Sequence, residues 1–107
     1  MIELIHVESG PHIDQIRGLF LEYARSLHFS LCFQSFDREL QELPGQYRLP
    51  DGRLILCLFD DEPAGCIALK KLEPAICEMK RLYVRPKYRG HSLGLKLVTH
   101  LISEARQ

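Results

Sequence analysis

The spacing of apolar residues changes along the chain, and each spacing predicts a different element. Residues 2–7 form a short strand-like stretch, which Ser9-Gly10-Pro11 ends. A helix is expected next, because apolar residues then recur three and four positions apart and so share one face. These residues are Ile13, Ile16, Phe20, Tyr23, Ala24 and Leu27.

The rest of the chain predicts a shorter helix, three strands and a final helix. Residues 33–43 (FQSFDRELQEL) have a helical pattern that Pro44-Gly45 stops. The nearly continuous apolar run of residues 54–59 predicts a strand buried on both faces, and residues 64–72 and 75–84 predict two more strands. The last helix is indicated by Leu93, Leu97, Val98, Leu101, Ile102 and Ala105. The order β-α-α-β-β-β-α predicts one α+β domain over residues 1–107, with a mainly antiparallel sheet flanked by helices.

The composition is that of an ordinary globular protein and favours no large class of partner. Of the 107 residues, 46% are hydrophobic and 26% are charged, and the formal net charge is +0. We therefore expect no nucleic acid and no membrane as partner. The first residues, MIELIHVES, lack the basic segment and the small-residue cleavage site of a signal peptide, so we expect a cytoplasmic protein.

The four cysteines, Cys32, Cys57, Cys66 and Cys77, form no C-x-x-C pair. The histidines do not join them at the spacing of a zinc site, so no metal is expected and free thiols fit best. Cys57 and Cys66 are candidates to face each other across a hairpin. At such positions, small buried hydrophobic side chains are favoured over a disulfide or a metal site.

Basic residues gather in one segment although the chain is neutral overall. The cluster consists of Lys80, Arg81, Arg85, Lys87 and Arg89, whereas many acidic residues lie earlier in the sequence. Two interpretations are open: a site for an anionic ligand, or solvated side chains beside a strand end. The motif that follows favours the anionic ligand.

A glycine-containing turn joins the last predicted strand to the last predicted helix. Residues 88–95 read YRGHSLGL, with Gly90 and Gly94 flanking the helix start. Such a turn can aim several backbone N–H groups at one point, and with the helix dipole they suit a phosphate or pyrophosphate. Glycines at a turn also serve backbone geometry alone, and the segment is neither a Walker loop nor a dinucleotide fingerprint.

The segment CEMKRLYVRPKYRGHSLGLKLV resembles the acetyl-CoA-binding motif of the GNAT N-acetyltransferase superfamily. That motif is Arg/Gln-x-x-Gly-x-Gly/Ala, after a strand that ends in an apolar-aromatic-Val run and a proline. The matching positions are Arg89, Gly90, His91, Ser92, Leu93 and Gly94, preceded by Leu82, Tyr83, Val84 and Pro86. The upstream segments LFLEYARSL, LCFQSFDRELQELPGQY and GCIALKKL also resemble one bacterial branch, so the resemblance covers nearly the whole chain. It implies the N-terminal part of the GNAT-like acyl-CoA N-acyltransferase fold.

The resemblance also implies how acetyl-CoA would bind. In the strand Leu82-Tyr83-Val84, the backbone of the first and third residues would pair with the pantetheine arm, and Arg89 to Gly94 would hold the pyrophosphate. Ser92 departs from the pattern, because it stands where the family usually has the second glycine of the loop. Its N–H can still donate, but its Cβ restricts φ and narrows access, which implies weaker cofactor binding. A helix N-cap is an equally open interpretation of Ser92.

Glu78 is the candidate catalytic base. Acetyl transfer to an amine needs a group that removes the ammonium proton, and Glu78 lies on the motif strand. It matches the position at which histone-acetylating members of the superfamily have a glutamate base. The other interpretation is an outward-facing carboxylate paired with Lys80 or a neighbouring lysine, and the sequence does not separate the two. Tyr83 is expected to pack rather than to catalyse.

The sequence stops at Gln107, where the family fold usually continues with a strand, a helix and two closing strands. That later segment often supplies a tyrosine that protonates the thiolate, and none of the four tyrosines matches its position. The uncovered strand edge leads us to expect a homodimer or larger assembly.

By resemblance, the function is transfer of acetyl from acetyl-CoA to a primary amine of a small molecule or peptide. The resemblance puts the acceptor pocket near residues 26–34, and it does not identify the acceptor. The early stop and Ser92 suggest an alternative, a catalytically inactive CoA-binding or oligomeric interaction module.

Overall fold

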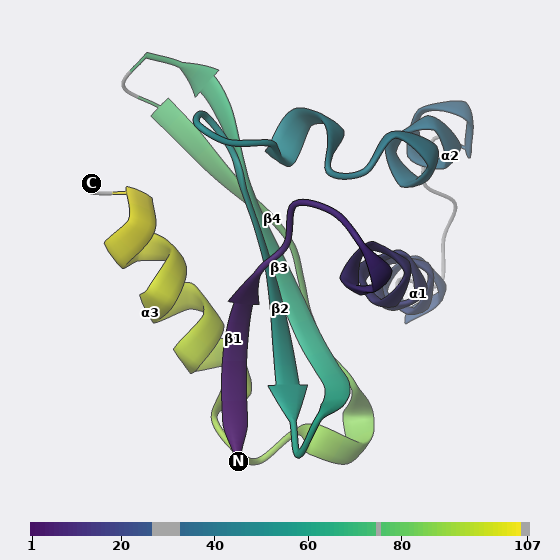
Figure 1. Cartoon of the computed structure of the whole chain (residues 1–107), viewed down its shortest axis with the longest axis vertical. Coiled ribbons are helices and arrows are strands. Elements are labelled where there is room, and N and C mark those ends of the chain that lie inside the picture. Colours follow the sequence, from purple (N-terminus) through teal and green to yellow (C-terminus); the bar gives the residue numbers. More distant parts are fainter. Residues whose placement is uncertain (27–32, 75, 106–107) are drawn as a thin grey trace.

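The computed structural model describes residues 1–26, 33–74 and 76–105, which form one four-stranded sheet with helices on both faces (Figure 1). Strands β1 (Ile2–His6), β2 (Arg53–Phe59), β3 (Glu62–Glu73) and β4 (Ile76–Val84) lie side by side in this order, and each pairs antiparallel with the next. The α+β class and the element order expected from the sequence are confirmed.

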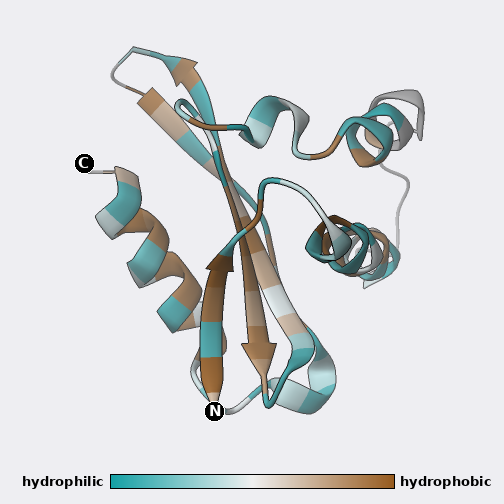
Figure 2. Ribbon diagram, viewed as in Figure 1, coloured by the Kyte–Doolittle hydropathy of each residue, from teal (hydrophilic) through white to brown (hydrophobic). Residues whose placement is uncertain are grey.

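Three helices flank the sheet. Helices α1 (Pro11–Ser26) and α2 (Phe33–Glu42) lie over one face, and α3 (Leu93–Ala105) lies over the other (Figure 1). Two short 3₁₀ turns, η1 (Gly45–Tyr47) and η2 (Pro86–Tyr88), lead into β2 and away from β4. Strand β2 is hydrophobic along most of its length, as its brown colour in Figure 2 shows.

The alternating side chains of β2 supply both hydrophobic cores. Leu54, Leu56 and Leu58 face α1 and α2, whereas Ile55 and Cys57 face α3. Because side chains alternate along a strand, a strand covered on both faces is apolar at every position. The continuous run of residues 54–59 therefore marks the centre of the fold, as its pattern predicts.

The two cysteines of the β2–β3 hairpin do not face each other. Cys66 pairs in register with Leu56, and Cys57 pairs with Gly65, so the two thiols enter opposite cores. Both are free and buried, and burial raises the pKa of each thiol. The prediction that they pack as small hydrophobic side chains is confirmed, whereas their juxtaposition across the hairpin is wrong. Cys32 and Leu27 lie outside the described residues.

A β-bulge shapes the middle of β4. Cys66 is opposite Tyr83 but Ala68 is opposite Lys80, so two residues of β4, Arg81 and Leu82, stand against one of β3. Arg81 has a φ of 60°, a left-handed conformation that is uncommon for a residue with a side chain. The bulge twists the strand that forms one edge of the sheet.

An ion pair holds the bulge against α2. The Nε and one terminal nitrogen of Arg81 each donate to a different carboxylate oxygen of Glu39, both at 2.9 Å. The two side chains are only 13% and 10% exposed. Bidentate pairing of this kind fixes the relative position of the two side chains and stabilises the fold. It therefore offsets the free-energy cost of the left-handed backbone conformation of Arg81.

None of the helices in the described part of the chain is long and apolar enough to cross a membrane.

Candidate active site

The loop after β4 presents unpaired backbone donors at the start of α3. In the turn between η2 and α3, Gly90 has a φ of 95°. The N–H groups of Gly90, His91 and Ser92 find no acceptor in the part of the chain that the structure describes. With the first N–H groups of α3, which have no partner inside the helix, they form a cluster of donors at the positive end of the helix dipole. Such an arrangement suits a phosphate group.

Ser92 occupies the position just before α3 in a conformation typical of glycine. Its φ is 61°, and its carbonyl accepts the N–H of Lys96 at 3.1 Å, the first bond of the helix. Its hydroxyl makes no hydrogen bond to any described residue. Ser92 is therefore at the N-cap position, but its side chain does not cap the helix. The expected steric cost of a Cβ at this position agrees with the observed φ.

Two side chains of the loop, His91 and Leu93, pack against other parts of the fold. The exposed ring of His91 lies 4.8 Å from that of Phe59, measured between ring centroids, and Leu93 is buried in the core under α3. Gly94 lies in the first turn of α3. What residues 90–94 offer a ligand is consequently their backbone.

Arg89 folds back onto the end of β4. Its Nε donates to the carbonyl of Val84 at 3.0 Å, and its guanidinium carbon lies 5.9 Å from the ring centre of Tyr83. Tyr83 is buried on the side of α1, Val84 is half-buried on the side of α3, and Leu82 is 42% exposed. Leu82, Tyr83 and Val84, the strand residues predicted to bind the cofactor, thus connect the bulge of β4 to the loop that follows it.

A pocket of about 380 Å³ wraps around the outer edge of β4, and we call it the edge pocket. It begins at the bulge, and both α1 and α3 contribute to its wall, through Tyr23 and Val98. Glu78 lines it and is exposed. No described residue forms an ion pair with Glu78, so the alternative interpretation, a pair with Lys80 or a neighbouring lysine, is not seen. A carboxylate that is exposed and unpaired in a pocket is accessible to a ligand.

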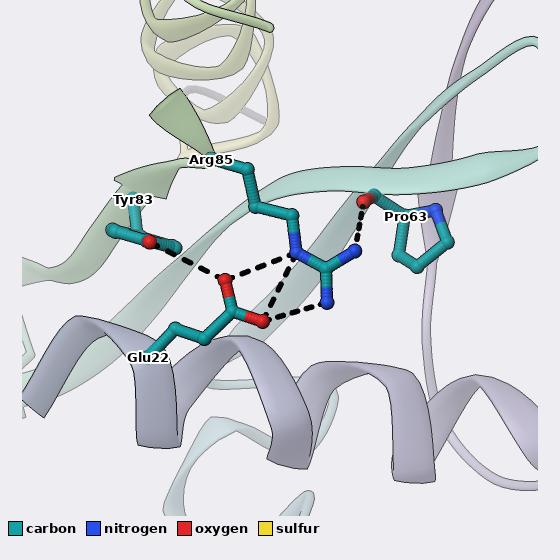
Figure 3. A network of polar contacts seen from close by, with 4 residues as sticks. All are labelled: Glu22, Pro63, Tyr83 and Arg85. Atoms are coloured by element: carbon teal, nitrogen blue, oxygen red, sulfur yellow. Dashed lines mark hydrogen bonds and ion pairs between the residues drawn. The ribbon is translucent and has the colours of Figure 1, made fainter. Parts of the chain in front are cut away.

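A second polar network lies at the C-terminal end of β4 (Figure 3). Glu22 of α1 accepts bonds from Nε and a terminal nitrogen of Arg85, the shortest at 2.7 Å, and Arg85 also donates to the carbonyl of Pro63 at 3.0 Å. The hydroxyl of Tyr83 reaches the same carboxylate at 3.3 Å. Burial and the nearby Glu22 raise the pKa of Tyr83, whereas hydrogen bonding to Glu22 raises the pKa of Arg85. This network ties α1, the start of β3 and the end of β4 together, and Tyr83 packs as expected.

The five basic residues predicted as a cluster are divided by the fold. Arg81 and Arg85 are engaged by carboxylates of α2 and α1. Lys87 lies 5.2 Å from the ring centre of Tyr88, and Arg89 binds the end of β4. The interpretation of the cluster as one anion site is therefore wrong for Arg81 and Arg85, which serve the fold.

Sequence reasoning missed the two carboxylates that organise β4, Glu22 and Glu39. Each lies more than forty residues before its arginine, and each shares its helix with at least one other acidic residue. Nothing in their local sequence marks them. The predicted acceptor wall near residues 26–34 lies largely outside the described residues.

The chain belongs to the acetyltransferase (GNAT) family, whose model matches residues 14–107. An uncharacterised N-acetyltransferase of Schizosaccharomyces pombe is 36% identical over 103 residues, which cover 94% of this chain and 63% of that protein. The family expected from the loop motif is confirmed, and this family uses acetyl-CoA.

Solved structures show the same fold. A GNAT-family acetyltransferase from Staphylococcus aureus matches with a TM-score of 0.83 at 18% identity, over 99% of this chain and 66% of that one. The PaiA N-acetyltransferase from Thermoplasma acidophilum, solved with coenzyme A, matches with a TM-score of 0.73 at 20% identity, over 99% and 72% of the two chains. The chain spans 63% to 72% of the length of these three relatives.

Proposed function

We propose that this chain binds acetyl-CoA along β4 and the loop after it, and transfers the acetyl group to a primary amine of a small molecule or peptide. The observation that carries the proposal is the continuity of three features: an open strand edge with a bulge, a pocket around that edge, and a loop with free N–H groups. An extended amide-containing arm suits a strand edge, and a pyrophosphate suits the loop. The family assignment supports the same reaction.

In the proposed reaction, Glu78 removes the proton of the ammonium group and the amine then attacks the thioester carbonyl. A bulge leaves its extra residue without a strand partner, so a backbone N–H near Arg81 or Leu82 is in place to polarise that carbonyl. As the tetrahedral intermediate collapses to the amide, the C–S bond breaks and the CoA thiolate leaves. The nitrogen releases its second proton in this step and the thiolate takes up one proton, so that the products are the amide and CoA.

Thermal unfolding with and without acetyl-CoA tests the binding step. A ligand present at a hundred times its dissociation constant adds about 2.7 kcal/mol to the free energy of unfolding, which raises the midpoint of a domain this small by roughly 10 °C or more. No shift at millimolar acetyl-CoA would overturn the proposal. ATP serves as the control for a nucleotide that lacks the pantetheine arm.

Glu78→Gln separates binding from chemistry. We expect this variant to keep the thermal shift with acetyl-CoA and to lose roughly 10²–10⁴-fold in turnover, the usual contribution of a general base. Glu73→Gln is the matched control, because Glu73 is an exposed carboxylate at the far end of β3 and does not line the edge pocket. Equal activity of the two variants would remove Glu78 from the mechanism.

We further propose that a second copy of the chain covers the part of this edge that lies beyond the edge pocket, at the β3–β4 hairpin. Large apolar side chains are exposed there, at Leu72 and Ile76, and neither lines the edge pocket. An unpaired edge with apolar side chains is a template for association. Light scattering at micromolar concentration should show a dimer that Ile76→Lys weakens, and a monomeric parent chain would contradict this proposal.

A further inference from the structure

A second hollow, of about 500 Å³, lies beside the edge pocket on the side of the sheet that faces α2, and we call it the charged hollow. Residues of α2, η1, β3 and β4 line it. Its charged lining residues are Arg38, Glu39, Glu42, Lys70, Lys80 and Arg81. Helix α2, η1 and the β3–β4 hairpin surround this region of the molecule (Figure 1).

The charges that remain available in this hollow are mostly positive. Glu39 uses both carboxylate oxygens on Arg81, so that pair is neutral as a unit. Arg38, Lys70 and Lys80 make no ion pair with any residue in the described part of the chain. Glu42 is the one other carboxylate in the lining. Three cations that line one concave surface together with one unpaired carboxylate attract a small anion.

The charged hollow and the edge pocket meet at β4. Lys80 and Arg81 line both, and Glu78 lies two residues before Lys80 on the same strand. A molecule with an anionic group in the charged hollow therefore has its other end within reach of the edge pocket. This is the pocket in which the proposed base lies.

We propose that the acceptor is an amine that also carries a small anionic group, a carboxylate or a phosphate. The anion is held by Arg38, Lys70 and Lys80 of the charged hollow, and the amine enters the edge pocket beside Glu78. This inference rests on the proposed acetyl transfer for the amine, but the anion site is a property of the hollow itself. It selects against amines of the same length that are neutral or cationic at the far end.

Matched acceptors test the selectivity of the full chain. γ-Aminobutyrate and O-phosphoethanolamine supply a carboxylate and a phosphate, γ-aminobutyramide removes the charge, and putrescine replaces it with a cation. We expect kcat/KM for at least one anionic amine to exceed that for the amide about tenfold or more, which is what one charged hydrogen bond contributes. The better of the two anionic amines identifies the anion. Equal or faster turnover of the amide or of putrescine would overturn the inference.

Charge-removing variants locate the site. Lys70→Gln and Lys80→Gln should each raise KM for the anionic amine about tenfold. Lys70 does not line the edge pocket, so Lys70→Gln should also leave kcat for the amide unchanged. Lys71→Gln is the matched control, because Lys71 is the next residue of β3, does not line the charged hollow and pairs at 3.3 Å with Asp51. An effect of the control as large as that of Lys70→Gln would place the selectivity elsewhere.

A binding experiment without acetyl-CoA separates failure of this inference from failure of the proposed transfer. Titration of the ¹⁵N-labelled chain with γ-aminobutyrate or O-phosphoethanolamine should shift the amide signals of residues 70, 80 and 81, and the shifts should be lost in the Lys70→Gln variant. Such shifts without turnover would contradict the transfer and retain the anion site. Turnover of neutral amines without such shifts would retain the transfer and overturn the anion site.

Discussion

Ser92→Gly should stabilise the fold and strengthen acetyl-CoA binding at the same time. At a φ of 61°, a residue with a Cβ is in the left-handed region, which costs roughly 1–2 kcal/mol relative to the right-handed one. Glycine removes this cost, but it also makes the unfolded chain more flexible, which lowers the free energy of unfolding by about 0.4–1 kcal/mol. The hydroxyl of Ser92 bonds to no described residue, so its removal loses no contact. The net gain expected is about 0.5–1 kcal/mol, or a rise of a few degrees in the unfolding midpoint.

Ser103→Gly is the control for this prediction. Ser103 is exposed in the last turns of α3, where the same chemical change removes helix propensity and costs about 0.5 kcal/mol. The two variants should therefore move the midpoint in opposite directions in the same thermal scan. The acetyl-CoA titration should tighten for Ser92→Gly and stay unchanged for Ser103→Gly. Destabilisation by Ser92→Gly would refute the reasoning, because it would mean that the serine side chain supports the loop.

Three further predictions concern the fold that carries the site. Gly65→Ala should lower the free energy of unfolding by about 1–3 kcal/mol, because its Cβ would come within 2.7 Å of a backbone oxygen of β4. In contrast, the Cβ of Gly18→Ala on α1 meets no atom within 4 Å, so this variant should raise the free energy of unfolding by about 0.5–1 kcal/mol. Denaturant unfolding measures both. Glu39→Ala should lower the free energy of unfolding by roughly 3 kcal/mol, because it leaves Arg81 without its ion-pair partner at the bulge. Asp51→Ala breaks only the exposed pair with Lys71, so it should change the free energy of unfolding by less than about 0.5 kcal/mol. Burial raises the pKa of the Cys66 thiol above its ordinary value of 9.0, so the unfolded chain loses this proton first. The stabilising effect present below pH 9 is therefore lost as the pH rises further, by about 1.4 kcal/mol per unit. Between pH 9 and pH 10.5 the unfolding free energy of Cys66→Ala should thus fall less steeply than that of the parent chain, and parallel curves would contradict the assignment.

The parts of this protein that could be predicted from the sequence are those whose cause is local. The burial of β2 on both faces follows from an unbroken apolar run, and the turn between β4 and α3 follows from two glycines between a strand and a helix. The position of Ser92 could be recognised as one that needs a positive φ, because the family pattern has glycine there. The structure agrees, with a φ of 61°. Each of these features depends on fewer than about ten neighbouring residues, within the range that a sequence pattern describes.

The features that could not be predicted depend on which residues are paired across the sheet. The register of β3 on β2 sends Cys57 and Cys66 into opposite cores, and a shift of one residue would have reversed that result. In the same way, the bulge turns Arg81 toward α2, where Glu39 binds it, so that a residue of an apparent basic cluster becomes part of the scaffold.

The positive charge that this pairing leaves unneutralised is the basis of the proposed acceptor selectivity. With Arg81 neutralised by α2, and Arg85 neutralised by α1, the positive charge beside Glu78 comes from Arg38, Lys70 and Lys80, which three different elements supply. The charge that an acceptor meets is therefore set by the folded arrangement of the sheet edge rather than by the basic segment of the sequence. For this reason a charge-matched series of amines is a sharper test of the site than the removal of any one arginine from that segment.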